Sequence, residues 1–185
     1  MTGSYPPAMA DPAEPRLSMA EWLVLCLLCE EPTYGQVLTG LLARDGRMGQ
    51  VWWVPKSMVY RALQRLERAG LTRATGQQRS RHGPGRSLYE ATVAGRLAAR
   101  AWLSTPAEHA RDVRSELMAK LALLDRTGAD PRELLQAQMA RLLPVAAALE
   151  DRLQATTGFE HALTLYRHES VSGTLRFLQA LTSPP

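Results

Sequence analysis

The residues whose types and spacing point to chemistry lie between Pro55 and Gly70, in the segment PKSMVYRALQRLERAG. If this segment is a helix, one face presents cations, a phenol and an amide, on Lys56, Ser57, Tyr60, Arg61, Gln64, Arg65 and Arg68. Phosphates and base edges in the major groove of DNA bind groups of these kinds. An ordinary surface helix with a solvated charged face would show the same pattern. The segment alone therefore leaves both interpretations open.

The opposite face of the same segment carries the residues that would position it. Val59, Ala62, Leu63 and Leu66 lie at i, i+3, i+4 and i+7, which is the spacing of one buried side of a helix. Gly70 follows as a residue able to take the left-handed conformation that ends a helix. We predict a helix over residues 55–69 that is anchored by one face and exposes the other.

A second basic segment follows this helix. Residues 71–75 (LTRAT) and 87–91 (SLYEA) are typical of two short strands, and residues 77–86 (QQRSRHGPGR) would form the tip of a β-hairpin with a turn-forming Gly-Pro-Gly. The candidate DNA contacts of the tip are Arg79, Arg81, His82 and Arg86. A basic hairpin directly after a basic helix is the order of a winged helix-turn-helix, and it favours DNA binding over the plain surface helix.

The distribution of charge agrees with a polyanionic partner. The chain of 185 residues has a formal net charge of +4 and a pI near 9.4. The part through Ser104 has 13 Lys and Arg against 8 Asp and Glu, whereas the remainder has 9 against 10. The basic excess therefore lies in the N-terminal part, as expected for a nucleic-acid-binding domain.

Further elements are predicted on both sides of the basic helix. Ser18 and Glu21 form a capping box before the apolar run 22–28, which predicts a core or dimer-interface helix. Residues 33–36 (TYGQ) repeat the capping pattern and predict a helix that ends near 45–46. Thr92 predicts the N-cap of a helix after the hairpin, and residues 105–108 (TPAE) and 130–133 (DPRE) predict the starts of two helices that form an antiparallel hairpin.

The C-terminal part has the pattern of a coiled coil. Its seam has the 4, 3, 4, 3, 4 spacing of a heptad and consists of Leu135, Met139, Leu142, Ala146, Leu149 and Leu153. Pro144 is expected to kink this helix, and residues 157–160 open a last one. The predicted fold is mainly α with a small β-hairpin. It has a disordered arm over 1–16, a winged helix-turn-helix domain over 17–104 and a helical, coiled-coil-like dimerisation domain over 105–185.

Other classes of function have little support. Cys26 and Cys29 have the C-x-x-C spacing but lie in an apolar run without a second ligand pair, which predicts buried thiols rather than a zinc or redox site. The histidines are scattered, and we find no nucleophile motif or phosphate-binding loop. We expect no catalytic site, no metal and no cofactor. The apolar run is too short to span a bilayer, so we expect a cytoplasmic protein.

Three stretches together resemble the DNA-binding domain of PadR-type transcriptional regulators: LVLCLLCEEPTYGQVLTGLL, SMVYRALQRLERAGL and GRSLYEATVAGRLAARAWL, all between Leu17 and Leu103. The stretch RSELMAKLALLD resembles the start of the dimerisation region of the subgroup related to the virulence activator AphA. The resemblance implies a dimeric regulator, most often a repressor, that a small effector releases from DNA. By position, the DNA-contacting elements of the family fall on Lys56, Ser57, Tyr60, Arg61 and Gln64 and on Arg79, Arg81, His82 and Arg86.

Two further sets of residues are predicted to bind partners. A small aromatic or apolar effector is expected near Trp52, Trp53 or Trp102, because indoles close to a domain junction supply flat apolar walls. The homodimer is expected to use Trp22, Leu117, Leu121, Leu135, Leu142, Leu149, Leu153, Leu163, Leu175 and Leu178. Two alternatives to double-stranded DNA binding are a winged-helix module in which Arg61, Arg65 and Arg81 bind an acidic protein surface, and a coiled-coil adaptor.

Overall fold

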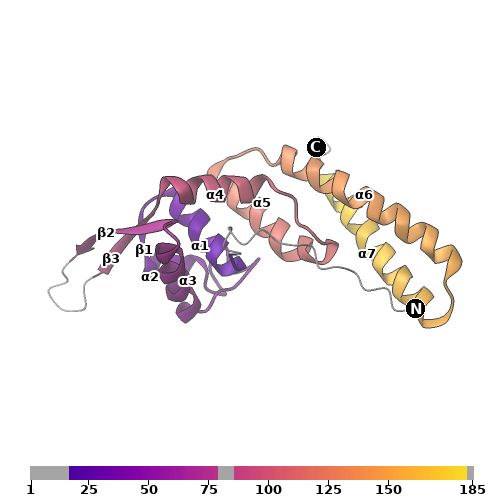
Figure 1. Ribbon diagram of the computed structural model, residues 1–185, viewed down its shortest axis with the longest axis horizontal. Helices are drawn as coiled ribbons and strands as arrows, with labels where there is room; N and C mark the ends of the chain where they lie inside the picture. Colours follow the sequence, from indigo (N-terminus) through magenta and orange to yellow (C-terminus); the bar gives the residue numbers. More distant parts are fainter. Residues whose placement is uncertain (1–16, 79–85, 183–185) are drawn as a thin grey trace.

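A small antiparallel sheet and the helices around it form one end of the molecule, and two long paired helices form the other (Figure 1). The computed structural model describes residues 17–78 and 86–182, so the predicted arm over 1–16 lies outside the described residues. The first end contains α1 (Met19–Glu30), β1 (Thr33–Tyr34), α2 (Gly35–Leu41), α3 (Lys56–Arg68), β2 (Thr72–Gln78), β3 (Arg86–Ala91) and α4 (Val93–Ser104).

The second end begins with two short irregular turns. These are η1 (Ala110–Asp112), a 3₁₀ turn, and η2 (Val113–Leu117), a π turn that runs directly into α5 (Met118–Thr127). The long helices α6 (Arg132–Ala155) and α7 (Gly158–Thr182) follow and pack along each other. The predicted fold class, a mainly α winged helix-turn-helix followed by C-terminal helices, is confirmed. No helix in the described part of the chain is long and apolar enough to cross a membrane.

The first helix, α1, is the centre of the winged domain. It begins at the predicted capping box, in which the Glu21 N–H donates to Ser18 Oγ and the Ser18 N–H donates to Glu21 Oε2 at 2.6 Å. Each residue from Leu23 to Leu28 is at most 4% exposed. Of the two predicted roles for this helix, core or dimer interface, these residues have the first, because α3, α4, α5 and β3 of the same chain surround them.

The sheet has the strand order β1-β3-β2, so β2 is an edge strand. Thr33 of β1 pairs with Tyr89, a contact that the sequence did not indicate. The capping box predicted over 33–36 is wrong, because Thr33 and Tyr34 are drawn into pairing with β3 and the helix begins at Gly35 without a side-chain cap. This helix also ends at Leu41 instead of near 45–46. The carbonyl of Leu41 accepts a hydrogen bond from the N–H of Met48 in the following loop.

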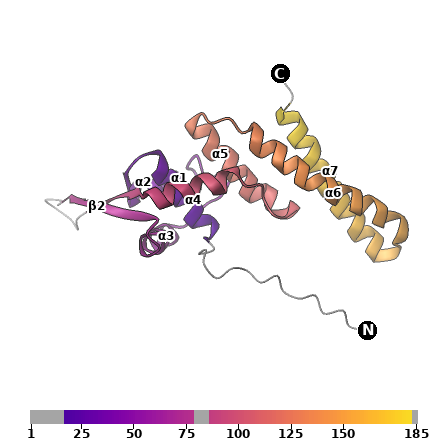
Figure 2. The same ribbon diagram turned by 45° about the horizontal axis from the view of Figure 1, so that its top comes forward.

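Two predictions about the helices after Ser104 are also wrong. Residues 105–109 are not helical, because the N–H and carbonyl of Ala107 bind the side chain of Gln138 instead of forming the first turn of a helix. The two predicted helices do not form an antiparallel hairpin either. Helix α5 packs against α1, and the partner of α6 along its length is α7 (Figure 2).

The C-terminal core lies between α5, α6 and α7 of the same chain. Of the residues predicted to form a dimer, Leu117, Leu135, Leu142, Leu175 and Leu178 are buried in this core. Leu121 and Leu149 pack partly buried against it. The heptad seam is therefore covered by the chain's own last helix. Among the predicted dimer residues, Trp22 and Leu153 are half-buried and Leu163 is exposed, so these three remain accessible to a second copy.

Candidate nucleic-acid interface

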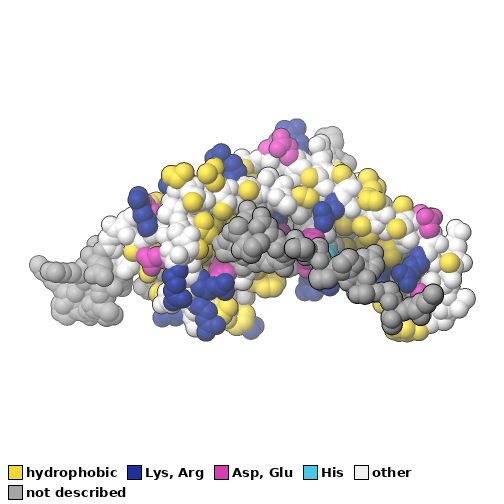
Figure 3. Space-filling view, viewed as in Figure 1, with side chains coloured by type: hydrophobic (Ala, Val, Ile, Leu, Met, Phe, Trp, Pro, Cys, Tyr) yellow, Lys and Arg dark blue, Asp and Glu magenta, His cyan; other side chains and the backbone are white. Residues whose placement is uncertain are grey.

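The polar face of α3 is an exposed basic surface of the winged domain. Val59, Ala62, Leu63 and Leu66 are each at most 2% exposed and fix the helix against α1 and α2. The opposite face is exposed along its length and carries Lys56, Ser57, Tyr60, Arg61, Gln64, Arg65 and Arg68. Figure 3 shows Lys and Arg side chains gathered over this helix. The predicted division of this helix into a buried and an exposed face is confirmed.

Tyr60 is held in place by the start of α2. A Cβ atom at Gly35 would lie 2.8 Å from Cε1 of the Tyr60 ring, closer than side chains normally approach. A side chain at position 35 would therefore force the Tyr60 ring to shift. The Tyr-Gly pair in the sequence thus has a physical role, because it fixes the phenol at the exposed face of α3.

Arg65 differs from its neighbours on the exposed face because it has a buried partner. Its Nε lies 2.9 Å from Oε1 of Glu21, whose side chain is only 3% exposed. The pair joins α3 to the capped start of α1. Among the described residues, no ion pair involves Lys56, Arg61 or Arg68, so their cationic groups are available to a ligand. No sequence pattern indicated that Arg65 is engaged in this way.

The stem of the wing is a regular pair of strands with one irregularity near Thr75. Arg73 of β2 forms an ion pair with Glu90 of β3 across the two strands. The register shifts between Ala74 and Gly76, as in a β-bulge. Of the predicted contacts of the tip, Arg79, Arg81 and His82 lie outside the described residues. Arg86 begins β3, and its side chain is not described.

The base of the wing is tied to α4 through Thr92. Its hydroxyl oxygen accepts a hydrogen bond from the N–H of Gly95 at 3.1 Å, which confirms the predicted N-cap, and the hydroxyl donates to the carbonyl of Gly70 at 2.7 Å. A Cβ at Gly95 would lie 2.0 Å from the carbonyl oxygen of Leu71, so the start of α4 approaches this backbone as only glycine can. These contacts fix the end of α3, the wing and α4 relative to one another.

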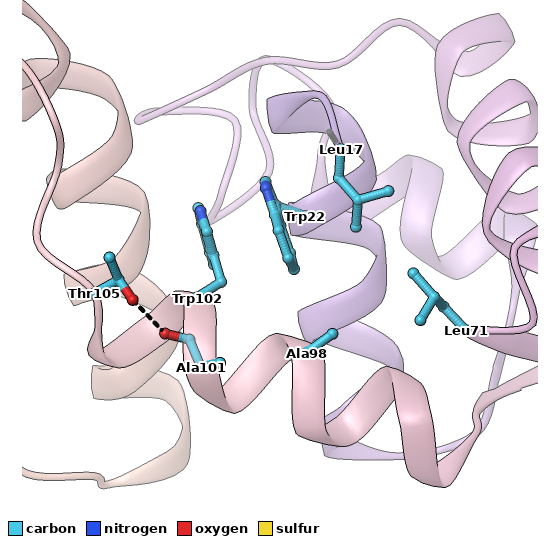
Figure 4. Close-up of a pocket in the computed structure, with 7 residues that line it drawn as sticks. All are labelled: Leu17, Trp22, Leu71, Ala98, Ala101, Trp102 and Thr105. Carbon is cyan, nitrogen blue, oxygen red and sulfur yellow. Dashed lines mark hydrogen bonds between the residues drawn. The ribbon is translucent and has the colours of Figure 1, made fainter. Parts of the chain in front are cut away.

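Trp102 is one wall of a cavity of about 410 Å³ where α1 and α4 meet (Figure 4). Its ring is stacked on that of Trp22, with 5.1 Å between centroids and 6° between planes. The remaining walls are apolar except for Thr105 and comprise Leu17, Leu71, Ala98 and Ala101. The sequence did not indicate Trp22 as part of this site, because its partner is in a different helix far along the chain.

The other two predicted effector residues lie elsewhere. Trp52 and Trp53 are adjacent, both are partly exposed, and neither lines the cavity beside Trp102. The guanidinium of Arg44 lies 4.3 Å from the ring centroid of Trp53. The structure therefore separates the three predicted tryptophans into one that lines a cavity and two on the surface of the loop before α3.

The two cysteines are free thiols within the winged domain. Burial raises the pKa of Cys26 far above its usual range, and burial also raises the pKa of Cys29, against the opposing effect of Arg96. A thiol that stays protonated is a poor nucleophile and a poor metal ligand. Within residues 17–78 and 86–182, no group of His, Cys, Asp and Glu could hold a metal ion.

Part of the winged domain matches a known protein family. Residues 24–101 match the family described as "Transcriptional regulator PadR-like family". No curated protein matches the sequence. Among solved structures, PadR of Bacillus subtilis in complex with operator DNA is 18% identical, with a TM-score of 0.47 over 89% of this chain and 97% of that one. The same protein with p-coumaric acid is 17% identical, with a TM-score of 0.42 over 91% and 96%.

Proposed function

Residues 24–101 match the PadR-like family of transcriptional regulators, and on this premise we propose that the chain is a dimeric repressor that leaves a near-palindromic operator when a small aromatic or apolar effector binds. The family consists of regulators and not of enzymes. The match to this family supports the coarse function, a DNA-binding regulator. We further propose which residues contact DNA, that the protein is a dimer and a repressor, and that it binds an effector.

The observation that carries the proposal is the two-sided character of α3. One face is almost entirely buried, so the helix is rigidly held, and the other exposes Lys56, Tyr60, Arg61 and Gln64 side by side. We assign these side chains to the major groove, where amide and guanidinium groups read base edges and cations hold phosphates. Arg79, Arg81 and Arg86 of the wing are assigned to phosphate or the adjacent minor groove.

Binding to DNA is tested with DNA from next to the protein's own gene, against a duplex of random sequence. The wild-type protein should be retained on heparin and should shift the gene-flanking DNA more tightly than the random duplex. Arg61→Ala should weaken binding and reduce the salt slope by about one unit. Arg167→Ala, which removes an exposed arginine of α7, is the matched control and should change neither. Equal binding of both duplexes at physiological salt would exclude sequence-specific recognition.

The proposed dimer uses the outer face of α7. Phe159, Leu163, Tyr166, Phe177 and Leu181 are all exposed, and their spacings of 4, 3, 11 and 4 residues place them on one side of the helix. The stripe extends over about 33 Å at 1.5 Å per residue. A second copy is the natural occupant, because two winged domains about 34–36 Å apart can read both halves of a near-palindrome.

The proposed effector site is the cavity beside Trp22 and Trp102, which we call the tryptophan pocket. Its lining includes no charged side chain, and its two stacked indoles offer flat apolar surface. A neutral aromatic ligand fits such walls better than a polar or ionic one. The pocket lies beside Thr105, where the winged domain ends, so its occupancy can affect how the two ends of the molecule are arranged.

The tryptophans allow a controlled test of this site. A panel of neutral aromatic compounds is screened for loss of operator binding, and tryptophan fluorescence is recorded for each. Trp102→Leu should abolish the response to an active compound, whereas Trp52→Leu, which removes an indole outside the pocket, should leave the response intact. A compound that releases DNA equally from both variants would place its site elsewhere.

A further inference from the structure

The connector between the two ends of the molecule, residues 105–109, is held by side chains of α6. The amide of Gln138 binds Ala107 twice, because its Oε1 accepts from the N–H at 2.7 Å and its Nε2 donates to the carbonyl at 3.3 Å. The carbonyl of Glu108 accepts a hydrogen bond from Nε of Arg141 at 3.0 Å. Ala107 and Gln138 are both 0% exposed. The connector therefore moves with α6, because water cannot replace these buried bonds without opening the core.

Lys120 of α5 binds the same connector from the side of the winged domain. Its Nζ donates to the carbonyl of Thr105 at 2.6 Å and to Oε1 of Glu116 at 2.5 Å, and it lies 4.6 Å from the ring centroid of Trp102. The Lys120 side chain is 0% exposed. A buried ammonium cannot exchange a lost partner for water, so its position depends on all of these contacts at once.

The contacts of Lys120 adjoin the tryptophan pocket. Trp102 and Thr105 both line the pocket, and both contact Lys120. The Trp102 ring is also stacked on Trp22, so any ligand that shifts this ring acts on the ammonium as well. A continuous series of contacts thus runs from the pocket through Lys120 to the connector, and from the connector through Gln138 to α6.

We propose that Lys120 and Gln138 are positioning residues that transmit the occupancy of the tryptophan pocket to the α6–α7 hairpin. A ligand in the pocket displaces Trp102 or Thr105, and Lys120 follows because its buried ammonium contacts both residues. The connector then shifts, and Gln138 carries the shift into α6. In a dimer joined through α7, this changes the spacing of the two α3 helices. The inference rests on the proposed function, since it needs an effector in this pocket and a DNA-binding dimer.

Two substitutions interrupt the contacts without changing the pocket walls. Lys120→Met removes the ammonium and keeps the apolar stem. Gln138→Leu removes both hydrogen bonds of the side-chain amide to Ala107 and keeps a similar side-chain volume. Their matched controls are Arg114→Met and Gln136→Leu, which remove exposed polar groups from η2 and from α6. The ligand probe is N-phenyl-1-naphthylamine, a neutral aromatic amine, and its affinity is followed by energy transfer from tryptophan. The DNA probe is a duplex that the wild-type protein selects from a random library.

The quantity measured is the change in DNA affinity when the dye saturates the protein. The wild type and both controls should lose about tenfold or more of their DNA affinity, as is typical of coupled sites. Lys120→Met and Gln138→Leu should bind the dye and the free DNA within about threefold of wild type, yet the dye should no longer change their affinity for DNA. Coupling of wild-type size in both variants overturns the inference and leaves the proposed function standing.

Two further outcomes are decisive. If saturating dye leaves the DNA affinity of the wild type unchanged, the effector part of the proposed function fails, and the coupling fails with it. Hydrogen exchange of the wild-type protein provides a readout that needs no folded variant. Binding of the dye should alter amide exchange within residues 105–109 and in the first turns of α6, and unchanged exchange at both places would overturn the inference.

Discussion

The winged domain and the α6–α7 hairpin cover their apolar residues in different ways. In the winged domain, a helix with an apolar run from Leu23 to Leu28 is surrounded on all sides by elements of the same chain. In the hairpin, only one face of α7 is covered, by Val171, Leu175 and Leu178 against α6. Its outer face leaves Phe159 82% and Tyr166 72% exposed.

This difference indicates which part of the molecule is self-sufficient. The winged domain completes its core with Ala119 and Leu123 of α5 and needs no second copy to bury it. The hairpin has a core of its own but also the exposed apolar stripe from Phe159 to Leu181 on α7, and contiguous exposed apolar surface often marks an interaction site. The winged domain together with α5 thus covers its own apolar residues, whereas the surface proposed for a second copy lies on the α6–α7 hairpin. The following predictions test that contrast.

The largest effect is expected from a charge in the exposed stripe of α7. Tyr166→Glu should convert the dimer to a monomer, since a buried carboxylate would lack a partner in the interface. Operator affinity should fall toward the non-specific range of roughly 10⁻⁴–10⁻⁶ M. Sedimentation and gel shift measure the two effects together. Arg176→Glu adds a similar charge to another exposed face of α7 and should leave the dimer intact. A Tyr166→Glu protein that remains dimeric would contradict the assignment of this face.

Truncation tests whether α5 belongs to the winged domain. A fragment that ends at Ser104 loses Ala119 and Leu123 from the core around α1, and it also loses the pair of hydrogen bonds between Arg126 and Glu30. We expect it to be less stable than a fragment that ends at Ala129 by roughly 3 kcal/mol, the scale of burying one large apolar side chain. Urea denaturation of both fragments measures the difference. Equal stabilities would show that α5 contributes nothing to this core.

Base recognition should separate from phosphate binding within the winged domain. Gln64→Ala should change sequence preference by about 1–3 kcal/mol at one or two base pairs, because an amide can pair with one base edge and not with another. Arg81→Ala should instead weaken all sequences alike and flatten the salt slope by about one unit. Binding of both variants to a set of singly substituted duplexes distinguishes the two effects. If both bind operator like wild type at physiological salt, the docking of α3 and the wing is wrong.

The smallest effect concerns the thiols of α1. Because burial raises the pKa of Cys26 and of Cys29, both should react with iodoacetamide at neutral pH more slowly than a free thiol. In the fragment that ends at Ser104 the reaction should be faster, since α5 no longer covers α1. Mass spectrometry of the alkylated protein follows both sites. Fast alkylation of the intact chain would mean that the elements around α1 separate often enough to expose the two thiols.

Four patterns that depend on neighbours in the chain were read correctly from the sequence. The cap at Ser18, the buried and exposed faces of α3, the turn at Gly70 and the cap at Thr92 each involve residues within about one or two helical turns. The sequence also predicted the order of helices and strands that makes a winged helix-turn-helix. Local propensity, capping and apolar spacing all agree along this part of the chain, so the fold class could be predicted.

Where the structure departs from the prediction, a distant partner takes the groups that the local pattern needed. Strand β3 binds the backbone of residues 33–34, and Gln138 binds that of Ala107, so neither capping pattern starts a helix where it was expected. Only the tertiary structure pairs Arg65 with Glu21, stacks Trp22 on Trp102 and covers the α6 seam with α7. Such contacts join residues far apart in the chain, and whether two complementary surfaces meet depends on the packing of everything between them.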